Sequence, residues 1–198
     1  MKILAISDIH GDAGLVRKLA KQAKKENVDL VIIAGDLTWF GNQAKEIIQP
    51  FIKEGKQVIT IPGNHDPENI SEDLEQVYKG TINLHKKSFS KEDIGFFGTG
   101  TTDWGFYEDG KQVYKELSEA HKKIKDLKKK IMVVHCPPEG SKIELMGFPG
   151  SRGVRKAIDK FKPDFVICGH IHQGGGLFEN IDKSKVMNVA RRARIFEI

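Results

Sequence analysis

The chain has 198 residues, of which 39% are hydrophobic and 30% charged, so a disordered chain is excluded and a sizeable core can form. Lys and Arg total 32 against 27 Asp and Glu, and this net charge of +5 requires neither a nucleic acid nor a membrane as partner. Two Cys residues exclude a disulfide scaffold, and no apolar run is long enough for a secretory signal or a membrane helix. We therefore expect one domain over residues 1–198, in a soluble cytoplasmic protein without a membrane partner.

Short apolar runs alternate with longer amphipathic stretches, a pattern typical of strands and helices in turn. In chain order the pattern predicts a strand at Lys2–Ser7, a helix from an Asp12 N-cap to Asn27, a strand at Leu30–Ala34, a helix from Asn42 to Gly55, strands at Gln57–Ile61 and Ile94–Phe97, a helix at Lys111–Lys129, a strand at Ile131–His135, a helix from Ser151 to before Pro163, and a strand at Asp164–Cys168. Pro50 predicts a kink or an early break in the second helix. Residues 177–198 predict two or three further strands. The alternation predicts a layered α/β fold with helices covering a mostly parallel or mixed sheet.

Polar clusters follow five of these strands, and five of the seven His residues belong to them. The clusters are Asp8-Ile9-His10, Gly35-Asp36, Gly63-Asn64-His65-Asp66, His135 and Gly169-His170-Ile171-His172. Because ligands collect at the carboxyl ends of strands in α/β sheets, we expect the clusters to converge on one crevice. Carboxylate, amide and imidazole donors without thiolate suit Mn, Fe, Co, Ni or Zn, and their number fits two ions that share a bridging carboxylate. Phosphate-ester hydrolysis is the reaction class that most needs this arrangement.

The five clusters resemble the motifs of the calcineurin-like metallophosphoesterases, which are Asp-x-His, Gly-Asp, Gly-Asn-His-Asp/Glu, a lone His and Gly-His-x-His. All five occur here in that order, across residues 7–172. The resemblance implies a four-layered α/β/β/α sandwich. It also implies that the chain hydrolyses phosphate esters, phosphodiesters first among them, by in-line attack of a hydroxide that bridges two divalent ions. Mn is the first candidate for these ions, and Fe, Ni, Co and Zn are the alternatives.

The resemblance further implies a role for each motif residue. The ligands would be Asp8, His10 and His172 for the first ion, Asn64, His135 and His170 for the second, and Asp36 for both. His65 would protonate the leaving oxygen or stabilise the pentacoordinate phosphorus. Asp66 would orient His65 by accepting its other ring N–H. His85 and His121 match no motif, and we interpret both as surface residues.

Two stretches depart from the pattern of related enzymes. Gly35-Asp36 is followed by residues 37–41 without the Arg that protein Ser/Thr phosphatases carry there, which favours the smaller phosphoesterase or phosphodiesterase branch. Asn188-Val189-Ala190 stands where many relatives have Asn-Pro-Gly, which predicts a different turn after the last His pair.

Residues outside the motifs must recognise the substrate, which we expect to be a small phosphate ester. Aromatic side chains beside strand ends could stack on a base or an aryl group or, as an equal alternative, pack beneath the loops; they are Trp39, Phe40, Trp104, Phe106 and Tyr107. Arg152, near Arg155 at the start of a predicted helix, is a candidate phosphate clamp.

Other functions on the same fold are a non-catalytic protein-binding module, a phosphomonoesterase and a nuclease. The retromer vacuolar-sorting subunit is a binding module of this kind and departs from the ligand set, whereas His65 and all ligands are intact here. A nuclease of the recombination-repair type is longer, and 198 residues leave no room for a large DNA-capping domain. Nucleic acid is therefore not required as a partner.

Overall fold

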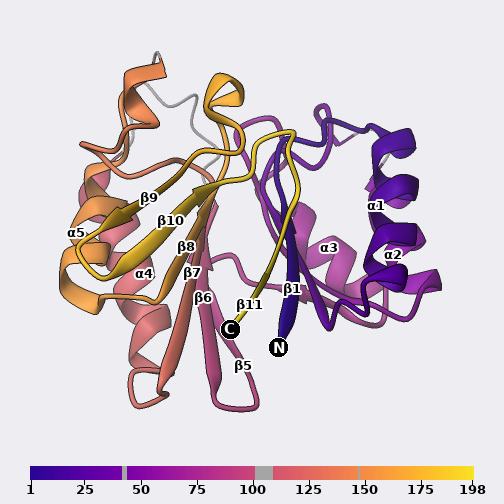
Figure 1. Cartoon of the computed structure of the whole chain (residues 1–198), viewed down its shortest axis with the longest axis horizontal. Helices are drawn as coiled ribbons and strands as arrows, with labels where there is room; N and C mark the ends of the chain where they lie inside the picture. Colours follow the sequence, from indigo (N-terminus) through magenta and orange to yellow (C-terminus); the bar gives the residue numbers. More distant parts are fainter. Residues whose placement is uncertain (42–43, 101–108, 147) are drawn as a thin grey trace.

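The computed structural model describes the chain except for residues 42–43, 101–108 and 147. Two β-sheets lie face to face at its centre, and helices cover both outer faces (Figure 1). This arrangement is a four-layered α/β/β/α sandwich and confirms the expected fold class.

The N-terminal half and the last strand form the first sheet, with strand order β11-β1-β2-β3-β4. Its strands are β1 (Lys2–Ile6), β2 (Leu30–Ala34), β3 (Gln57–Ile61), β4 (Thr81–Asn83) and β11 (Arg194–Glu197). Only β11 pairs antiparallel with its neighbour in this sheet. The covering helices are α1 (Ala13–Lys25), α2 (Ala44–Lys53) and α3 (Ile70–Val77).

The second sheet has the order β5-β6-β7-β8-β10-β9. Its strands are β5 (Lys87–Lys91), β6 (Ile94–Thr99), β7 (Lys129–Val134), β8 (Phe165–Cys168), β9 (Phe178–Ile181) and β10 (Ser184–Asn188). The helices α4 (Gly110–Lys122) and α5 (Arg152–Phe161) pack on its outer face. The tail of the chain thus contributes three strands, β9 to β11, as the sequence predicts.

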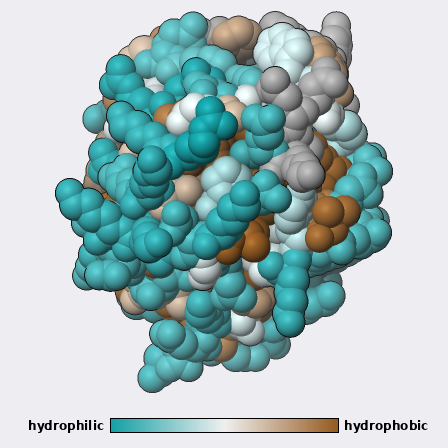
Figure 2. Space-filling view, turned by 90° about the vertical axis from the view of Figure 1, so that its right-hand side faces the viewer, coloured by the Kyte–Doolittle hydropathy of each residue, from teal (hydrophilic) through white to brown (hydrophobic). Residues whose placement is uncertain are grey.

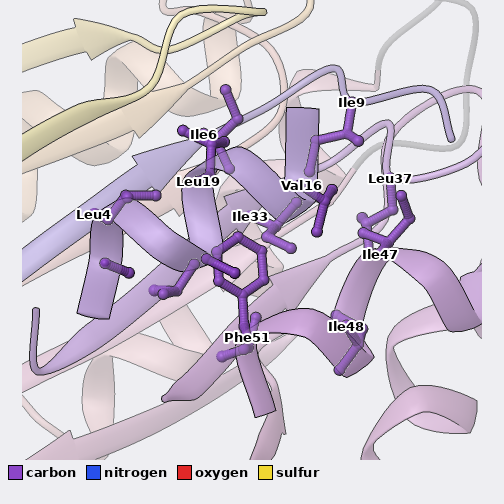
Figure 3. Close-up of a cluster of buried hydrophobic side chains, with 14 of the residues drawn as sticks. Leu4, Ile6, Ile9, Val16, Leu19, Ile33, Leu37, Ile47, Ile48 and Phe51 are labelled. Atoms are coloured by element: carbon purple, nitrogen blue, oxygen red, sulfur yellow. The ribbon is translucent and has the colours of Figure 1, made fainter. Parts of the chain in front are cut away.

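Three apolar layers hold the four structural layers together, one between the sheets and one beneath each set of helices. Beneath α1 and α2, the ring of Phe51 lies among aliphatic side chains that include Ile33 and Leu19 (Figure 3). The outward face of this half is mostly hydrophilic (Figure 2). Because both faces of β1 and β2 are covered, these strands are continuously apolar instead of alternating.

Two expectations about helix ends are corrected. The helix α4 ends at Lys122 and not near Lys129, because Ile124 N–H bonds to His121 O and Leu127 N–H to Ile124 O in tighter i to i+3 turns that lead into β7. The helix α2 continues past Pro50 to Lys53, so an early break at the proline is wrong.

The expected surface positions of His85 and His121 are also corrected. The side chain of His85 is only 11% exposed, and its Nδ1 accepts a hydrogen bond from Gly100 N–H. The His121 ring stacks on Phe161 with centroids 4.3 Å apart. Both histidines are therefore packing residues, because an imidazole can cover apolar surface as well as face water.

The carboxyl ends of the parallel strands in both sheets point to one end of the molecule, opposite the two termini (Figure 1). The chain ends lie side by side, with the Met1 ammonium donating to Ile198 O at 3.0 Å. Among the described residues, no helix combines the length and apolarity needed to cross a bilayer.

Candidate metal centre

The loop after β1 and the loop after β8 bring the first group of predicted ligands together. Asp8, His10 and His172 each offer a donor atom within 4.8 Å of the others. Asp8 Oδ1 lies 3.1 Å from His172 Nε2, and the Nε2 atoms of His10 and His172 are 3.3 Å apart. Two imidazoles and one carboxylate thus face a common point, a donor set that suits a first-row divalent ion.

A second group forms around the side-chain amide of Asn64. Its Oδ1 lies 3.0 Å from His135 Nε2 and 2.9 Å from His170 Nδ1. These residues come from the ends of β3, β7 and β8, so both sheets contribute to this group.

Asp36 lies between the two groups. Its Oδ2 is 3.5 Å from His10 Nε2 and 3.5 Å from His135 Nε2, one nitrogen from each group. Its Oδ1 accepts the backbone N–H of His65 at 2.8 Å. The structure thus places one carboxylate oxygen where it faces both halves of the ligand cluster.

Four of these ligands have left-handed backbone conformations, with φ values of 57° at Asp8, 48° at His10, 50° at Asp36 and 68° at His170. Such conformations cost non-glycine residues free energy and persist where surrounding contacts impose them. Here the contacts run between the ligand loops: His10 N–H donates to Asp36 O at 3.0 Å, and His170 N–H donates to Asp8 Oδ2 at 2.9 Å. The loops therefore hold one another in place.

Two motif glycines allow this close approach. A Cβ atom on Gly63 would overlap the backbone N and Oδ1 of Asp36. A Cβ on Gly169 would overlap Ser7 Oγ and Asp8 Oδ2. Gly63 and Gly169 thus leave room for neighbouring ligands and have no positive φ of their own.

The tautomer of His135 prepares it for metal binding. Its Nδ1 lies 2.9 Å from Ala34 O, and because a carbonyl only accepts, Nδ1 carries a proton. Nε2 then faces the Asn64 and Asp36 oxygens, and a proton or a cation at this position would be surrounded by oxygen acceptors. This arrangement fits a divalent ion.

The titration behaviour of the cluster agrees with that reading. Burial disfavours the charged form of His135, but the carboxylates of Asp36 and Asp8 outweigh this effect and raise its pKa to about 9. Burial and the nearby His135 charge lower the pKa of His170 to about 4. Burial alone would raise the pKa of Asp36, yet His135 and the His65 N–H lower it overall. Without metal, these shifts favour the ionised form of the Asp36 carboxylate and the protonated form of His135.

We expect metal affinity to rise with pH for this reason. Below pH 9 an incoming ion must displace the His135 proton, whereas His170 is already neutral. The apparent metal affinity should therefore rise by roughly tenfold per pH unit between pH 6.5 and 8, and it should level off above pH 9. Calorimetric Mn²⁺ titrations in two buffers of different ionisation enthalpy measure both the affinity and the protons released. A pH-independent affinity would contradict a protonated His135.

The expected contact between Asp66 and His65 is corrected. The Asp66 carboxylate accepts hydrogen bonds of 2.8 to 2.9 Å from Leu37 N, Gly63 N, and both the N and Oγ1 of Thr38. None of these described partners is a ring nitrogen of His65. Burial raises the pKa of Asp66, but these four donors support its ionised form. Asp66 joins the loop after β2 to the loop after β3.

Aromatic rings, rather than a carboxylate, surround the imidazole of His65. The Trp39 ring stacks on it with centroids 4.5 Å apart and planes at 13°. The rings of Phe40 and His10 meet it edge to face, at 5.5 and 5.0 Å. Trp39 thus lies against a predicted catalytic side chain.

The structure does not bring the predicted phosphate clamp at Arg152 to the cluster. The Arg152 side chain is 83% exposed and pairs with Glu139 at 3.0 Å, and Arg155 pairs with Asp159. This placement gives no support to a phosphate clamp at the start of α5. Trp104, Phe106 and Tyr107 lie outside the described residues.

Two residues near the C-terminus support the ligand loops: the sequence did not point to Arg191 at all, and it pointed to Asn188 only as part of a turn. Arg191 Nη1 donates to the backbone oxygens of Asp8 (3.2 Å) and Ile9 (3.1 Å). Asn188 Nδ2 donates to Ile171 O, and Asn188 Oδ1 accepts from Ala190 N, which forms the turn after the last His pair. No local pattern signals Arg191, because its partners are more than 180 residues away in sequence.

Replacing Arg191 with Ala should weaken metal binding about tenfold, since removing a group that supports a ligand typically costs 10- to 100-fold. The matched control is Arg192→Ala, which removes the same charge from an exposed neighbour that donates no side-chain hydrogen bond among the described residues. Competition with a fluorescent chelator measures both. Equal affinities in the two variants would show that Arg191 acts only through its charge.

A pocket of about 430 Å³ opens beside the ligand cluster. Its lining residues are Asp36, Asn64, His65, Phe148, His170, His172 and Gln173. No Lys or Arg belongs to this described lining. The pocket has room for a small molecule, with metal ligands along one side.

Comparisons with known proteins agree with this centre. A family profile described as calcineurin-like phosphoesterase matches residues 1–174. A UPF0046 protein of Caenorhabditis elegans is 23% identical over 203 residues, which cover 91% of this chain and 66% of that protein. The chain thus spans about two thirds of the length of this relative.

Two solved structures share the fold. The protein TT1561 of Thermus thermophilus aligns with a TM-score of 0.74 at 21% identity, covering 93% of this chain and 87% of that chain. An archaeal phosphodiesterase aligns with a TM-score of 0.51 at 24% identity, covering 95% and 82%. The profile match includes every ligand motif, and the chain therefore belongs to the calcineurin-like phosphoesterase family and is a metal-dependent phosphoesterase.

Proposed function

We propose that the chain hydrolyses small phosphodiesters with two divalent ions, Mn²⁺ being the first to test. The observation that carries this proposal is the pocket, where metal ligands and His65 meet and no described lining residue is Lys or Arg. The stretches 42–43, 101–108 and 147 contain no Lys or Arg either. Bound metal would then be the first source of positive charge for a substrate in this pocket.

The charge of the substrate favours a diester over a monoester. A phosphodiester carries one negative charge, whereas an ionised phosphomonoester carries close to two near neutral pH. Enzymes usually meet additional phosphate charge with Arg or Lys. A site without these side chains fits the monoanion.

Each ligand group would hold one ion, with Asp36 shared between them. When bound, such ions supply Lewis acidity and an activated water for an in-line displacement. Asp36 stays ionised and, through Oδ1, fixes the backbone of His65. His65 lines the pocket and belongs to neither ligand group, so its ring would serve as the proton donor to the leaving oxygen.

The test compares bis-p-nitrophenyl phosphate with p-nitrophenyl phosphate. The Mn²⁺-loaded protein should show a kcat/KM at least about tenfold higher on the diester, as expected for about 1.4 kcal/mol of charge discrimination. EDTA should abolish both activities, and Mn²⁺ should restore them. A preference for the monoester would overturn the diester assignment. A fully metallated but inert protein would instead favour the binding-module alternative.

A further inference from the structure

The loop after β2 and the loop after β3 form one interlocked unit. Asp66 binds Leu37 and Thr38 on the first loop and Gly63 on its own loop. Phe40 N–H donates to His65 O at 2.9 Å, which adds a second link. The Thr38 Oγ1 accepts Gly41 N–H at 3.0 Å and closes the turn that contains Trp39. These hydrogen bonds join the backbones of the two loops and so place the side chains of Trp39 and His65 next to each other.

The stack of Trp39 on His65 is not ordinary core packing. The Trp39 side chain remains 51% exposed although one ring face covers the imidazole. A tryptophan placed for burial alone would hide most of its surface, because aromatic side chains contribute mainly through the area they bury. The main contact that the Trp39 ring makes in this place is therefore the stack on the His65 ring.

The geometry points to Trp39 as a positioning residue for His65, an inference that rests on the proposed role of His65 as proton donor. Stacked rings with centroids 4.5 Å apart restrict the tilt of the imidazole. The Phe40 and His10 edges restrict rotation out of the stack. The ring is thereby kept facing the pocket, beside the ligands, as proton transfer to a leaving oxygen requires.

This role differs from direct substrate binding, which the sequence suggests for Trp39. A substrate contact would act on KM whatever the state of His65, whereas a positioning residue acts on kcat and only while His65 is present. Trp39 is also absent from the residues described as lining the pocket.

The experiment uses two diesters that differ only in the leaving group, methyl p-nitrophenyl phosphate and methyl phenyl phosphate. Trp39→Ala should lower kcat about tenfold on the phenyl ester, which is the upper range for the loss of an aromatic pair. The loss of kcat should be smaller on the nitrophenyl ester, because its leaving group needs less protonation. KM and metal content should stay within about twofold. Trp39→Phe should recover most of the kcat, because a ring face is retained.

A double-mutant cycle decides the mechanism. In a His65→Ala background, Trp39→Ala should change kcat by less than about twofold, since the residue through which it acts is gone. An undiminished effect in that background, or a rise in KM with kcat unchanged, would overturn the proposal and make Trp39 a substrate contact. If His65→Ala itself left kcat unchanged, the proposed function of His65 would fail instead.

Phe178→Ala serves as the matched control. This aromatic is 43% exposed on β9 and contacts Arg194 rather than any ligand. Its removal should leave kcat on both diesters unchanged. Thermal unfolding of each variant distinguishes a loss of folding from a loss of His65 positioning. A folded Trp39→Ala protein with wild-type kcat on the phenyl ester would refute the inference.

Discussion

Asp36→Ala should abolish activity and reduce the metal content from two ions per chain to fewer than one. Its Oδ2 faces His10 and His135 at the same distance of 3.5 Å, so one substitution removes a donor from both ligand groups. Removing the carboxylate also leaves His135 and His10 without their nearest charge partner. We expect kcat to fall by at least about 10³-fold, which corresponds to roughly 4 kcal/mol.

Metal analysis after reconstitution with Mn²⁺, combined with the diester assay, checks this expectation. The matched control is Asp126→Ala, which removes an equal charge from an exposed turn before β7. That variant should retain both ions and full activity. An Asp36→Ala protein that kept two ions and wild-type kcat would exclude the bridging role.

His65→Ala should show the opposite combination, a large loss of turnover with little loss of metal. Its ring belongs to neither ligand group, although it meets the His10 ring edge to face, and alanine retains its backbone N–H bond to Asp36. A positioned proton donor typically contributes 10²- to 10⁴-fold, so kcat should fall within that range, more on poor leaving groups.

Added imidazole should restore part of the activity of His65→Ala, because the vacated space beside Trp39 can admit the free ring. The matched control is His121→Ala, a histidine that also stacks on an aromatic ring but belongs to the last turn of α4, where it packs on Phe161. It should retain wild-type kcat. If His65→Ala lost metal in proportion to activity, His65 would be a support for the ligands rather than a proton donor.

Much of the fold was accessible from local patterns. The continuously apolar runs of β1 and β2 mark strands covered on both faces. Asp12 caps α1 as predicted, and the helix predicted to start at Ser151 is α5. Short elements were missed, among them α3 and the three-residue strand β4, because few residues carry too little periodicity. The end of α4 was misplaced because apolar residues continue beyond the helix into turns.

The sequence by itself predicted the candidate ligands and their chemistry, because the ends of parallel strands meet at one edge of a sheet and carry the motif residues there. The tertiary structure decided how those residues are supported. Asp66 binds backbone amides instead of His65, Trp39 takes the place beside the imidazole, and Arg191 reaches the Asp8 loop from the far end of the chain. Such contacts depend on how loops pack against one another across the sheets. A short motif encodes which donors are present, whereas orientation is a property of the surrounding packed loops.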